Sequence, residues 1–232
     1  MRRSAELEMM DLPGQPRELV TEDLRNLRLI NRYLGCHRNV LRGLARLVST
    51  NQLRAFTLLD VGTGSADIPE VIVRWARANH ISARIVALER DPVTVEEAAE
   101  QTRKLPEITV IRGDGMSPPF DAASFDFVLA SQLLHHFSDA QILAALRTWA
   151  RLARGAIIVN DLVRHPLAYQ GIRLVTKMFT HNEMTRTDGP RSVERACTMS
   201  EWRELFRRAN VGKFSLQWTL PFRVLGVISI SR

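Results

Sequence analysis

From about residue 56 onward, short apolar runs alternate with segments of helical periodicity. This alternation is typical of a parallel sheet with helices wound on both of its faces. The runs that predict buried strands are 56–61, 84–89, 108–112, 125–131 and 156–160, and the segments that predict helices between them are 66–80, 94–104 and 138–154. We therefore expect a doubly wound α/β fold.

The alternation pauses after residue 162. Residues 163–198 contain a predicted helix at 167–179 and a polar stretch at 181–195, and we expect them to form a helical lid inserted into the core. The core then resumes with a helix from Ser200, its predicted N-cap, to Asn210. Two further strands, at 214–220 and 222–230, can pair as an antiparallel hairpin around Pro221, where the proline favours a bend.

The first 50 residues have a different pattern. Leucine, isoleucine and valine recur there at helical spacing, and Gly35 is expected to divide the segment into two helices. The predicted organisation is an N-terminal helical cap at 1–50 and an α/β core at 51–232 that carries the lid at 163–198.

A glycine turn follows the first predicted strand, in the run Asp60-Val61-Gly62-Thr63-Gly64-Ser65-Ala66-Asp67. Gly62 and Gly64 permit a tight turn and close approach of a ligand to the backbone. Such a turn alone is shared by proteins that bind dinucleotides, nucleosides and phosphates.

The side chains of the turn separate these possibilities. A dinucleotide fingerprint has a third glycine where this chain has Asp67, so a pyrophosphate would meet a carboxylate. No Gly-Lys-Ser/Thr follows the turn, which argues against a P-loop. Opposite charges 4 Å apart gain about 1–4 kcal/mol between bulk water and a protein surface, so Asp60 and Asp67 favour a cationic nucleoside.

Two later strand ends fit the same pocket. Glu89 ends the second strand, where a carboxylate can accept hydrogen bonds from both hydroxyls of a ribose. Gly113-Asp114-Gly115 follows the third strand, and Asp114 can accept from an adenine amino group while Gly115 leaves space for the ring. A plain Asp-Gly turn is the alternative at this second place.

These motifs, together with 118–126 and Leu134-His135-His136-Phe137, resemble the class I S-adenosylmethionine-dependent methyltransferases, in particular the branch called methyltransferase type 11. The resemblance covers about residues 55–162. It implies a Rossmann-like, mostly parallel sheet of seven strands with an antiparallel last hairpin and S-adenosyl-L-methionine as cofactor; most members of the family have no metal, and none is expected here. This chain departs from the family at Ala66, where a glycine is common; the small size of alanine predicts a mild effect.

The candidate cofactor site follows from these motifs and this resemblance. The residues expected to bind the cofactor are Asp60, Gly62, Thr63, Gly64, Asp67, Glu89, Arg90, Gly113, Asp114, Gly115 and Ser131.

His135 and His136 follow the fourth strand and are the candidate catalytic residues. Histidine titrates near neutral pH, so one of them can act as a general base on the methyl acceptor. Neighbouring side chains on a helical turn point about 100° apart, so we expect only one ring to face a given pocket. The alternative is that both rings only orient their loop through hydrogen bonds.

Polar residues of the lid are the candidates for binding the acceptor. They are His165, Tyr169, Arg186 and Arg191, and the two arginines suit an acidic acceptor.

Charge and composition limit the partners. The net charge of +7 favours anionic partners, but the basic residues are scattered and form no stripe with aromatic residues, so no nucleic acid is expected. The sequence shows no secretory signal and no apolar run of membrane-spanning length, which predicts a cytoplasmic monomer or homodimer without membrane contact. Two cysteines without CxxC spacing indicate neither a disulfide framework nor a zinc site.

Together, these features predict an enzyme that methylates a small molecule, with an oxygen of an aromatic or polyketide-like metabolite as the expected acceptor. Methylation of carbon on a quinone-type ring is the nearest alternative. A noncatalytic cofactor-binding module and an RNA-associated protein are alternatives of a different class.

Overall fold

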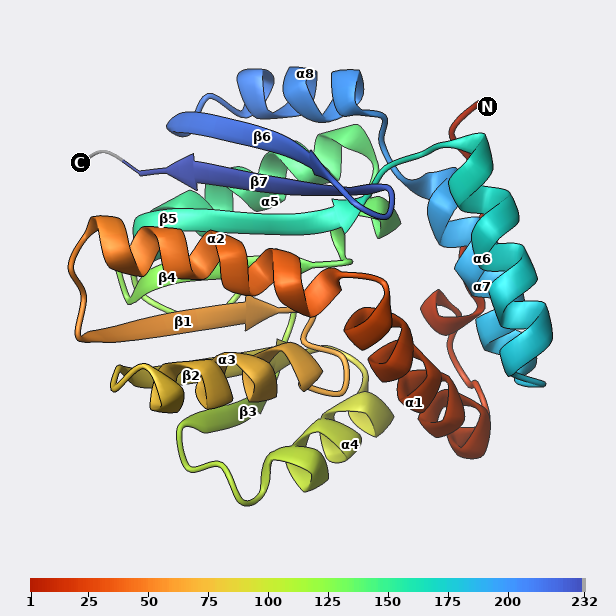
Figure 1. Ribbon diagram of the computed structural model, residues 1–232, viewed down its shortest axis with the longest axis horizontal. Coiled ribbons are helices and arrows are strands. Elements are labelled where there is room, and N and C mark those ends of the chain that lie inside the picture. The colour runs from red at the N-terminus through yellow and green to blue at the C-terminus, as the bar shows by residue number, and fades with distance from the viewer. Residues whose placement is uncertain (231–232) are drawn as a thin grey trace.

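A seven-stranded sheet forms the centre of the computed structural model, which describes residues 1–230 (Figure 1). The last two residues of the predicted core, 231–232, lie outside this range. The strand order is β3-β2-β1-β4-β5-β7-β6, in which β7 runs antiparallel to both of its neighbours and the other pairs are parallel. The strands are β1 (Ala55–Val61), β2 (Ser82–Glu89), β3 (Ile108–Arg112), β4 (Phe125–Ser131), β5 (Ala153–Leu162), β6 (Lys213–Thr219) and β7 (Arg223–Ser229). The predicted α/β fold and its antiparallel last hairpin are confirmed.

Helices cover both faces of the sheet and bury two apolar clusters against it. In the view of Figure 1, α2 and α3 lie in front of the sheet and α5 lies behind it, while α8 is seen at the top, above β6, and α4 at the bottom. Val40, Leu44 and Ile72 pack against the front face, whereas Trp149 and Trp202 pack against the back face. These five helices are α2 (Cys36–Thr50), α3 (Asp67–Ala78), α4 (Pro92–Thr102), α5 (Asp139–Leu152) and α8 (Met199–Ala209).

The remaining helices lie beyond the carboxyl ends of β1, β4 and β5, on the right of Figure 1. They are α1 (Arg17–Tyr33), α6 (Pro166–Phe179) and α7 (Glu183–Arg195), with two short 3-10 turns, η1 (Met9–Asp11) and η2 (Leu134–His136). The polar stretch at 181–195 is thus mostly the helix α7, whose N-cap Asn182 accepts from the amide of Thr185 at 2.9 Å. Helix α7 packs against α1, α6 and η1.

Side-chain caps fix several helix starts. Asp91 and Ser138 each accept a backbone amide at the start of α4 and α5, as expected of N-caps. The predicted N-cap of α8, Ser200, is wrong: Thr198 is the cap, because it forms a capping box with Glu201.

The strand order reverses at β1. The connection from the carboxyl end of β1 leads to β2 on one side, and the connection from β3 leads to β4 on the other side of β1. In doubly wound sheets, ligands bind at such a point. Among residues 1–230, no helix combines the length and the apolar character needed to cross a membrane.

Candidate active site

The glycine turn after β1 is held by hydrogen bonds from the end of β2. The amides of Gly62 and Thr63 donate to the Leu88 carbonyl at 2.9 and 3.1 Å, and the amide of Gly64 donates to Glu89 Oε2 at 3.0 Å. Gly62 and Gly64 both have positive φ, at 66° and 57°. A side chain at Gly64 would have nothing within 4 Å, so the backbone there is open to a ligand. The turn therefore has the shape expected of a nucleoside-binding loop.

Ala66, the N-cap of α3, also has a left-handed backbone, with φ of 58°. Glycine adopts this conformation without the steric cost that any other residue carries. Alanine therefore carries a steric cost at this position that glycine would not carry, and the size argument made from the sequence did not consider the backbone conformation.

Asp60 is the buried acid of the site. Its side chain is 1% exposed and accepts a hydrogen bond from Thr63 Oγ1 at 2.6 Å. Burial raises the pKa of Asp60 to about 7, against the opposing effect of the Thr63 hydroxyl, and the negative charges of Asp67 and Glu89 raise it further. A cation placed among these three carboxylates would relieve their repulsion.

Glu89 and Asp67 are both engaged with the protein. Glu89 Oε1 accepts from the amide of Arg90 at 2.7 Å, while its Oε2 accepts from Gly64. Asp67 Oδ2 lies 2.7 Å from His37 Nε2 and accepts from Asn31 Nδ2 at 3.1 Å. Asp67 therefore links the glycine turn to the N-terminal helices, and Glu89 is the more open of the two acids.

Helix α1 also contacts the glycine turn through Arg28, a residue that the sequence analysis did not identify. Arg28 Nη1 donates to the Ser65 carbonyl at 3.0 Å, and its Nη2 forms an ion pair with Glu70 on α3. The N-terminal helices therefore define one wall of the candidate cofactor site.

The Gly113-Asp114-Gly115 segment lies beside β1 and β2. Asp114 Oδ1 accepts from the amide of Met116 at 2.8 Å, which is the local turn that the sequence analysis left as the alternative. A Cβ on Gly115 would lie 2.4 Å from Val61 Cγ1, and a Cβ on Gly113 would lie 2.8 Å from Leu88 Cδ1. The two glycines thus let this segment pack closely against the first two strands.

Ser131 ends β4 inside a small polar cluster. Its Oγ accepts from Asn160 Nδ2 at 2.9 Å and lies 3.3 Å from Cys36 Sγ. Next to it, the amide group of Gln132 bridges two elements, because its Nε2 bonds to Asn31 and its Oε1 accepts from Arg223 at 2.9 Å. Ser131 is thus placed at the carboxyl edge with Asp60, as expected.

His135 and His136 lie side by side on η2. Their ring centroids are 4.3 Å apart, and both rings approach the same carboxylate, Glu8. The expectation that only one ring faces a given site is wrong, because η2 is a single 3-10 turn over which the N-terminal segment folds.

Buried carboxylates surround the two rings. His135 Nδ1 lies 2.7 Å from Asp161 Oδ1, and His136 Nδ1 lies 3.0 Å from Asp11 Oδ2. Burial alone would raise the pKa of Asp161, but the His135 imidazole holds it below its usual value. Burial raises the pKa of Glu8 to about 7, although His136 opposes the shift. The sequence analysis identified neither Asp161 nor Glu8.

Three of the four lid residues lie together. Tyr169, Arg186 and Arg191 line a shallow pocket of about 340 Å³ between α6 and α7. His165 instead caps α6 and stacks on Phe222, with ring centroids 4.8 Å apart. Arg191 pairs with Glu6 at 2.8 Å, so part of its charge is already balanced.

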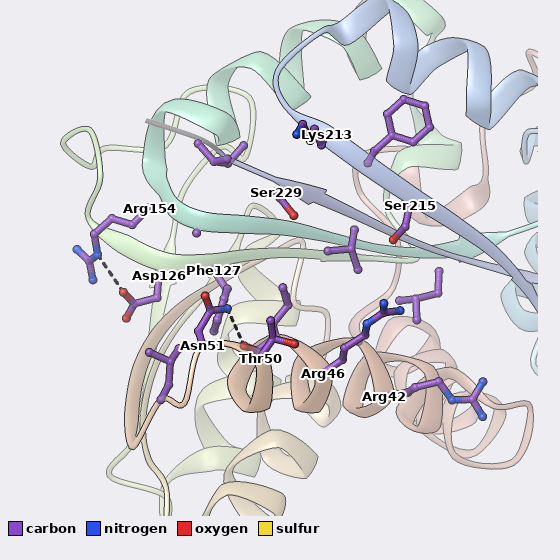
Figure 2. A pocket seen from close by; sticks show the side chains of 18 of the residues that line it. Arg42, Arg46, Thr50, Asn51, Asp126, Phe127, Arg154, Lys213, Ser215 and Ser229 are labelled. Atoms are coloured by element: carbon purple, nitrogen blue, oxygen red, sulfur yellow. Dashed lines mark hydrogen bonds and ion pairs between the residues drawn. The ribbon is translucent and has the colours of Figure 1, made fainter.

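A larger groove lies at the opposite edge of the sheet (Figure 2). It has a volume of about 840 Å³, and Arg42 and Arg46 on α2 face Lys213 and Ser215 on β6 across it. Asp126 and Arg154, paired at 2.9 Å, lie near the amino ends of β4 and β5. The groove is thus remote from the carboxyl edge that holds the glycine turn.

A family model and several solved structures are similar to this chain. Residues 58–155, from β1 to the start of β5, match a family model described as a methyltransferase domain. A methyltransferase from Aquifex aeolicus, described as dependent on S-adenosylmethionine, superposes with a TM-score of 0.66 at 15% identity, over 91% of this chain and 98% of that chain.

Two further solved structures are similar. A plantazolicin methyltransferase, solved with S-adenosylhomocysteine and a substrate analogue, gives a TM-score of 0.69 at 12% identity, over 93% of this chain and 98% of the other. Human N-acetylserotonin methyltransferase, solved with S-adenosylmethionine, gives 0.68 at 16% identity, over 100% of this chain and 63% of the human one. At these identities, the three structures show a common fold.

The family model adds a match in sequence to the similarity in fold. The matched residues include most of β1, the glycine turn, Glu89 and the Gly-Asp-Gly segment. Residues 58–155 therefore form a methyltransferase domain, and the chain has the fold of the S-adenosylmethionine-dependent methyltransferases to which it is similar.

Proposed function

We propose that this enzyme transfers the methyl group of S-adenosyl-L-methionine to an oxygen atom of a small aromatic or polyketide-like molecule. The cluster of Asp60, Asp67 and Glu89 around an open glycine turn is the observation that supports the cofactor site. The pKa of Asp60, raised to about 7, reflects burial and two neighbouring negative charges. A ligand with a sulfonium and an ammonium group offsets those charges, whereas a diphosphate adds to them.

In the proposed site, different residues of the chain bind different parts of the cofactor. Glu89 accepts the ribose hydroxyls, the backbone at Gly62 and Gly64 approaches the amino-acid part, and Asp60 contributes negative charge below the turn. Thr63, Arg90, Gly113, Asp114, Gly115 and Ser131 complete the proposed contacts. When bound, S-adenosylmethionine supplies an electrophilic methyl group on a positively charged sulfur.

The protein's part in the transfer is to hold the acceptor in line with that methyl group and to exclude water. As the acceptor oxygen bonds to the methyl carbon, the carbon–sulfur bond breaks and the acceptor releases its proton. His135 and His136 are the proposed bases for this proton. Their ring nitrogens lie near Glu8, Asp11 and Asp161, so a base role depends on a path from the acceptor to one of them.

The proposed acceptor class draws on two observations. Human N-acetylserotonin methyltransferase, which has a similar fold, is named for a small-molecule acceptor. Tyr169, Arg186 and Arg191 line one pocket, and we propose that this pocket, with His165, selects an acceptor that carries an acidic group. Methylation of carbon remains the alternative chemistry.

An assay with isotopically labelled S-adenosylmethionine and a panel of phenols, enols and quinones tests the proposal. We expect label on oxygen in a phenolic product, identified by mass spectrometry and NMR. Label on ring carbon would replace the O-methyl proposal with C-methylation, and a chain that binds the cofactor but labels no small molecule would contradict both.

The same assay tests the two histidines. Under saturating cofactor, His135→Ala and His136→Ala are compared with His80→Ala, a control on the surface turn after α3. General-base catalysis contributes about 100- to 10,000-fold in rate, so loss of the base should lower kcat by at least 100-fold. Unchanged kcat in both variants would eliminate the base role.

A further inference from the structure

The N-terminal segment places an acid directly over the histidine pair. Glu8 is 1% exposed, and its Oε1 lies 3.6 Å from His135 Nε2 and 3.8 Å from His136 Nδ1. Asp11, three residues later, lies 3.0 Å from His136 Nδ1 through its Oδ2. The potential ligand atoms of Glu8, His135 and His136 all lie within 4.8 Å of one another.

Glu8 Oε1 has no hydrogen-bond partner within residues 1–230. The distances to the two rings are too long for hydrogen bonds. Burying a carboxylate oxygen without a partner is costly, and buried polar atoms in native proteins are almost always paired with protein, water or an ion. The atom points to a bound species that supplies positive charge at this place.

The orientation of the His135 ring also suits a bound cation. Its Nδ1 lies 2.7 Å from Asp161 Oδ1, and its Nε2 is the ring nitrogen that faces Glu8. With the Nδ1 proton donated to the carboxylate, Nε2 is the nitrogen available to a metal ion. Asp161 itself is fixed by the amides of Leu134 and Leu162, at 2.9 and 2.7 Å. A carboxylate that fixes the second ring nitrogen is the usual companion of a histidine that binds a metal ion.

We propose that Glu8, His135 and His136 bind one divalent transition-metal ion, with Asp11 beside them as a fourth ligand. Bonds of about 2.0–2.1 Å to a tetrahedral zinc ion place neighbouring ligand atoms about 3.3 Å apart. The separations of 3.6 and 3.8 Å between Glu8 and the two rings need to shorten by a few tenths of an ångström, and the two ring nitrogens, which lie within 4.8 Å of each other, also have to reach this separation. On binding, His136 Nδ1 exchanges its contact with Asp11 for the metal ion.

The local charge balance suits a dication. Three carboxylates, those of Glu8, Asp11 and Asp161, approach the rings, and Asp188 adds a further negative charge near Glu8. Arg195 forms an ion pair with Glu8, and Arg191 offsets part of the charge of Asp188. Arg195 Nε lies 3.7 Å from Glu8 Oε1, but the guanidinium group donates to the carbonyls of His135, His136 and Glu6 and is held by them.

The ligand chemistry favours zinc over magnesium. Two imidazoles and two carboxylates form a mixed nitrogen and oxygen set, which zinc, cobalt and iron bind well, whereas magnesium prefers oxygen ligands in octahedral geometry. Such an ion would tie the N-terminal segment to η2 beside the carboxyl edge of the sheet. The proposal goes beyond methyl transfer and does not depend on cofactor binding, because a metal ion can bind here whether or not the cofactor does. An ion on these ring nitrogens occupies the lone pairs that the proposed base role needs, so the two roles of the histidines are alternatives, and zinc binding together with the kcat of the histidine variants decides between them.

The test uses the full chain after treatment with a chelator. Zinc binding is measured by calorimetry and by elemental analysis, and cobalt is added as a spectroscopic probe of the ligand geometry. The variants are Glu8→Gln, His135→Gln and, for the supporting carboxylate, Asp161→Asn. Glu6→Gln, which changes an exposed acid two residues away, is the matched control.

We expect one zinc ion per chain, intense visible absorption from tetrahedral cobalt, and no binding of magnesium at the same concentration. Loss of a supporting carboxylate typically lowers metal affinity about 10- to 100-fold, so Asp161→Asn should fall in this range and Glu8→Gln and His135→Gln should lose more. Glu6→Gln should bind as wild type does.

Binding of S-adenosylhomocysteine to each sample shows whether the variant is folded and keeps the metal result separate from the proposed function. Absence of zinc binding by the wild type would overturn the proposal, even if the cofactor binds. Zinc binding that is unchanged in Glu8→Gln and in His135→Gln would also overturn it, because the ion would then lie elsewhere. If a ligand variant fails to fold, the wild-type stoichiometry and the cobalt spectrum decide the question alone.

Discussion

Asp60 shows how a ligand site can reduce the stability of the free protein. Its carboxyl has a pKa of about 7 in the folded chain, against the ordinary value of 3.8 for an aspartate. Between these values the folded state holds a proton that the unfolded state has lost, so this contribution to stability falls as pH rises from about 4 to 7. Above pH 7, the buried charge persists until a cation binds beside it.

Asp60→Asn should therefore stabilise the free protein and weaken its binding of the cofactor. Asparagine keeps the shape of the side chain without the charge. A shift of one pKa unit corresponds to about 1.4 kcal/mol, so between pH 5 and pH 8 the wild type should lose about 2–3 kcal/mol that the variant keeps. Thermal unfolding at both pH values measures this difference, and calorimetry at pH 8 should show about 10-fold weaker binding of S-adenosylmethionine. A difference in Tm that does not change with pH would contradict the account of Asp60.

Ala66 gives a second prediction at the same scale. A left-handed backbone costs a residue other than glycine about 1–2 kcal/mol, so Ala66→Gly should stabilise the chain by about 1 kcal/mol after the added freedom of the unfolded glycine is subtracted. Chemical denaturation measures this change. Ala78→Gly, at the end of α3, is the control and should destabilise, because glycine lowers helix stability there. Destabilisation of both variants to the same degree would refute the conformational argument.

At the scale of elements, Gly35 sets the angle between the two N-terminal helices. It has φ of 81°, and a Cβ at this position would lie 2.8 Å from the Leu220 carbonyl oxygen. Helix α2 packs on the sheet, while α1 reaches the glycine turn through Arg28 and Asn31. The turn at Gly35 thus determines where α1 meets the cofactor site.

Gly35→Ala should therefore weaken cofactor binding although residue 35 makes no contact with the glycine turn. The left-handed backbone alone predicts a loss of about 1–2 kcal/mol in stability. The displacement of α1 should lower the affinity for S-adenosylhomocysteine, measured by calorimetry at a temperature where circular dichroism shows a folded chain. Gly14→Ala, at another positive φ with open space around it, is the control for backbone strain. Equal affinities of the two variants for S-adenosylhomocysteine would contradict a role of α1 in cofactor binding.

The sequence predicted the elements of the core well, because buried strands and helix caps depend on neighbouring residues. The strands Ile108–Arg112 and Phe125–Ser131 begin and end where the apolar runs do. The N-cap of α8 was misplaced by two residues because Thr198 and Ser200 are both good caps, and Glu201 decides between them. Helix α7 has few apolar residues and a proline within it, so its periodicity is weak.

At the scale of the whole molecule, the acids of the cofactor site could be predicted and the surroundings of the histidines could not. Asp60 and Glu89 end neighbouring strands, so the α/β pattern alone places them at one edge. The contacts of Glu8 with His135 and of Arg195 with the same loop join segments far apart in the chain, and no periodicity encodes them. For the same reason, the sequence indicated that the two histidines differ in direction, whereas the fold of the N-terminal segment brings both to one acid.

Three acidic residues lie together at one edge of the sheet, although the chain as a whole has a net charge of +7. Asp60, Asp67 and Glu89 form a local negative site, so the sign of the ligand is set by the site and not by the overall charge. A cationic nucleoside should bind there, and a dinucleotide with two phosphates should not.

Calorimetry of the full chain with S-adenosylmethionine and with NAD, at equal concentrations and pH 8, tests this claim most directly. The account predicts saturable binding of S-adenosylmethionine at one site per chain, weakened at least 10-fold by Glu89→Gln, and no measurable binding of NAD. Binding of NAD that Glu89→Gln alters, together with no heat from S-adenosylmethionine, would contradict it.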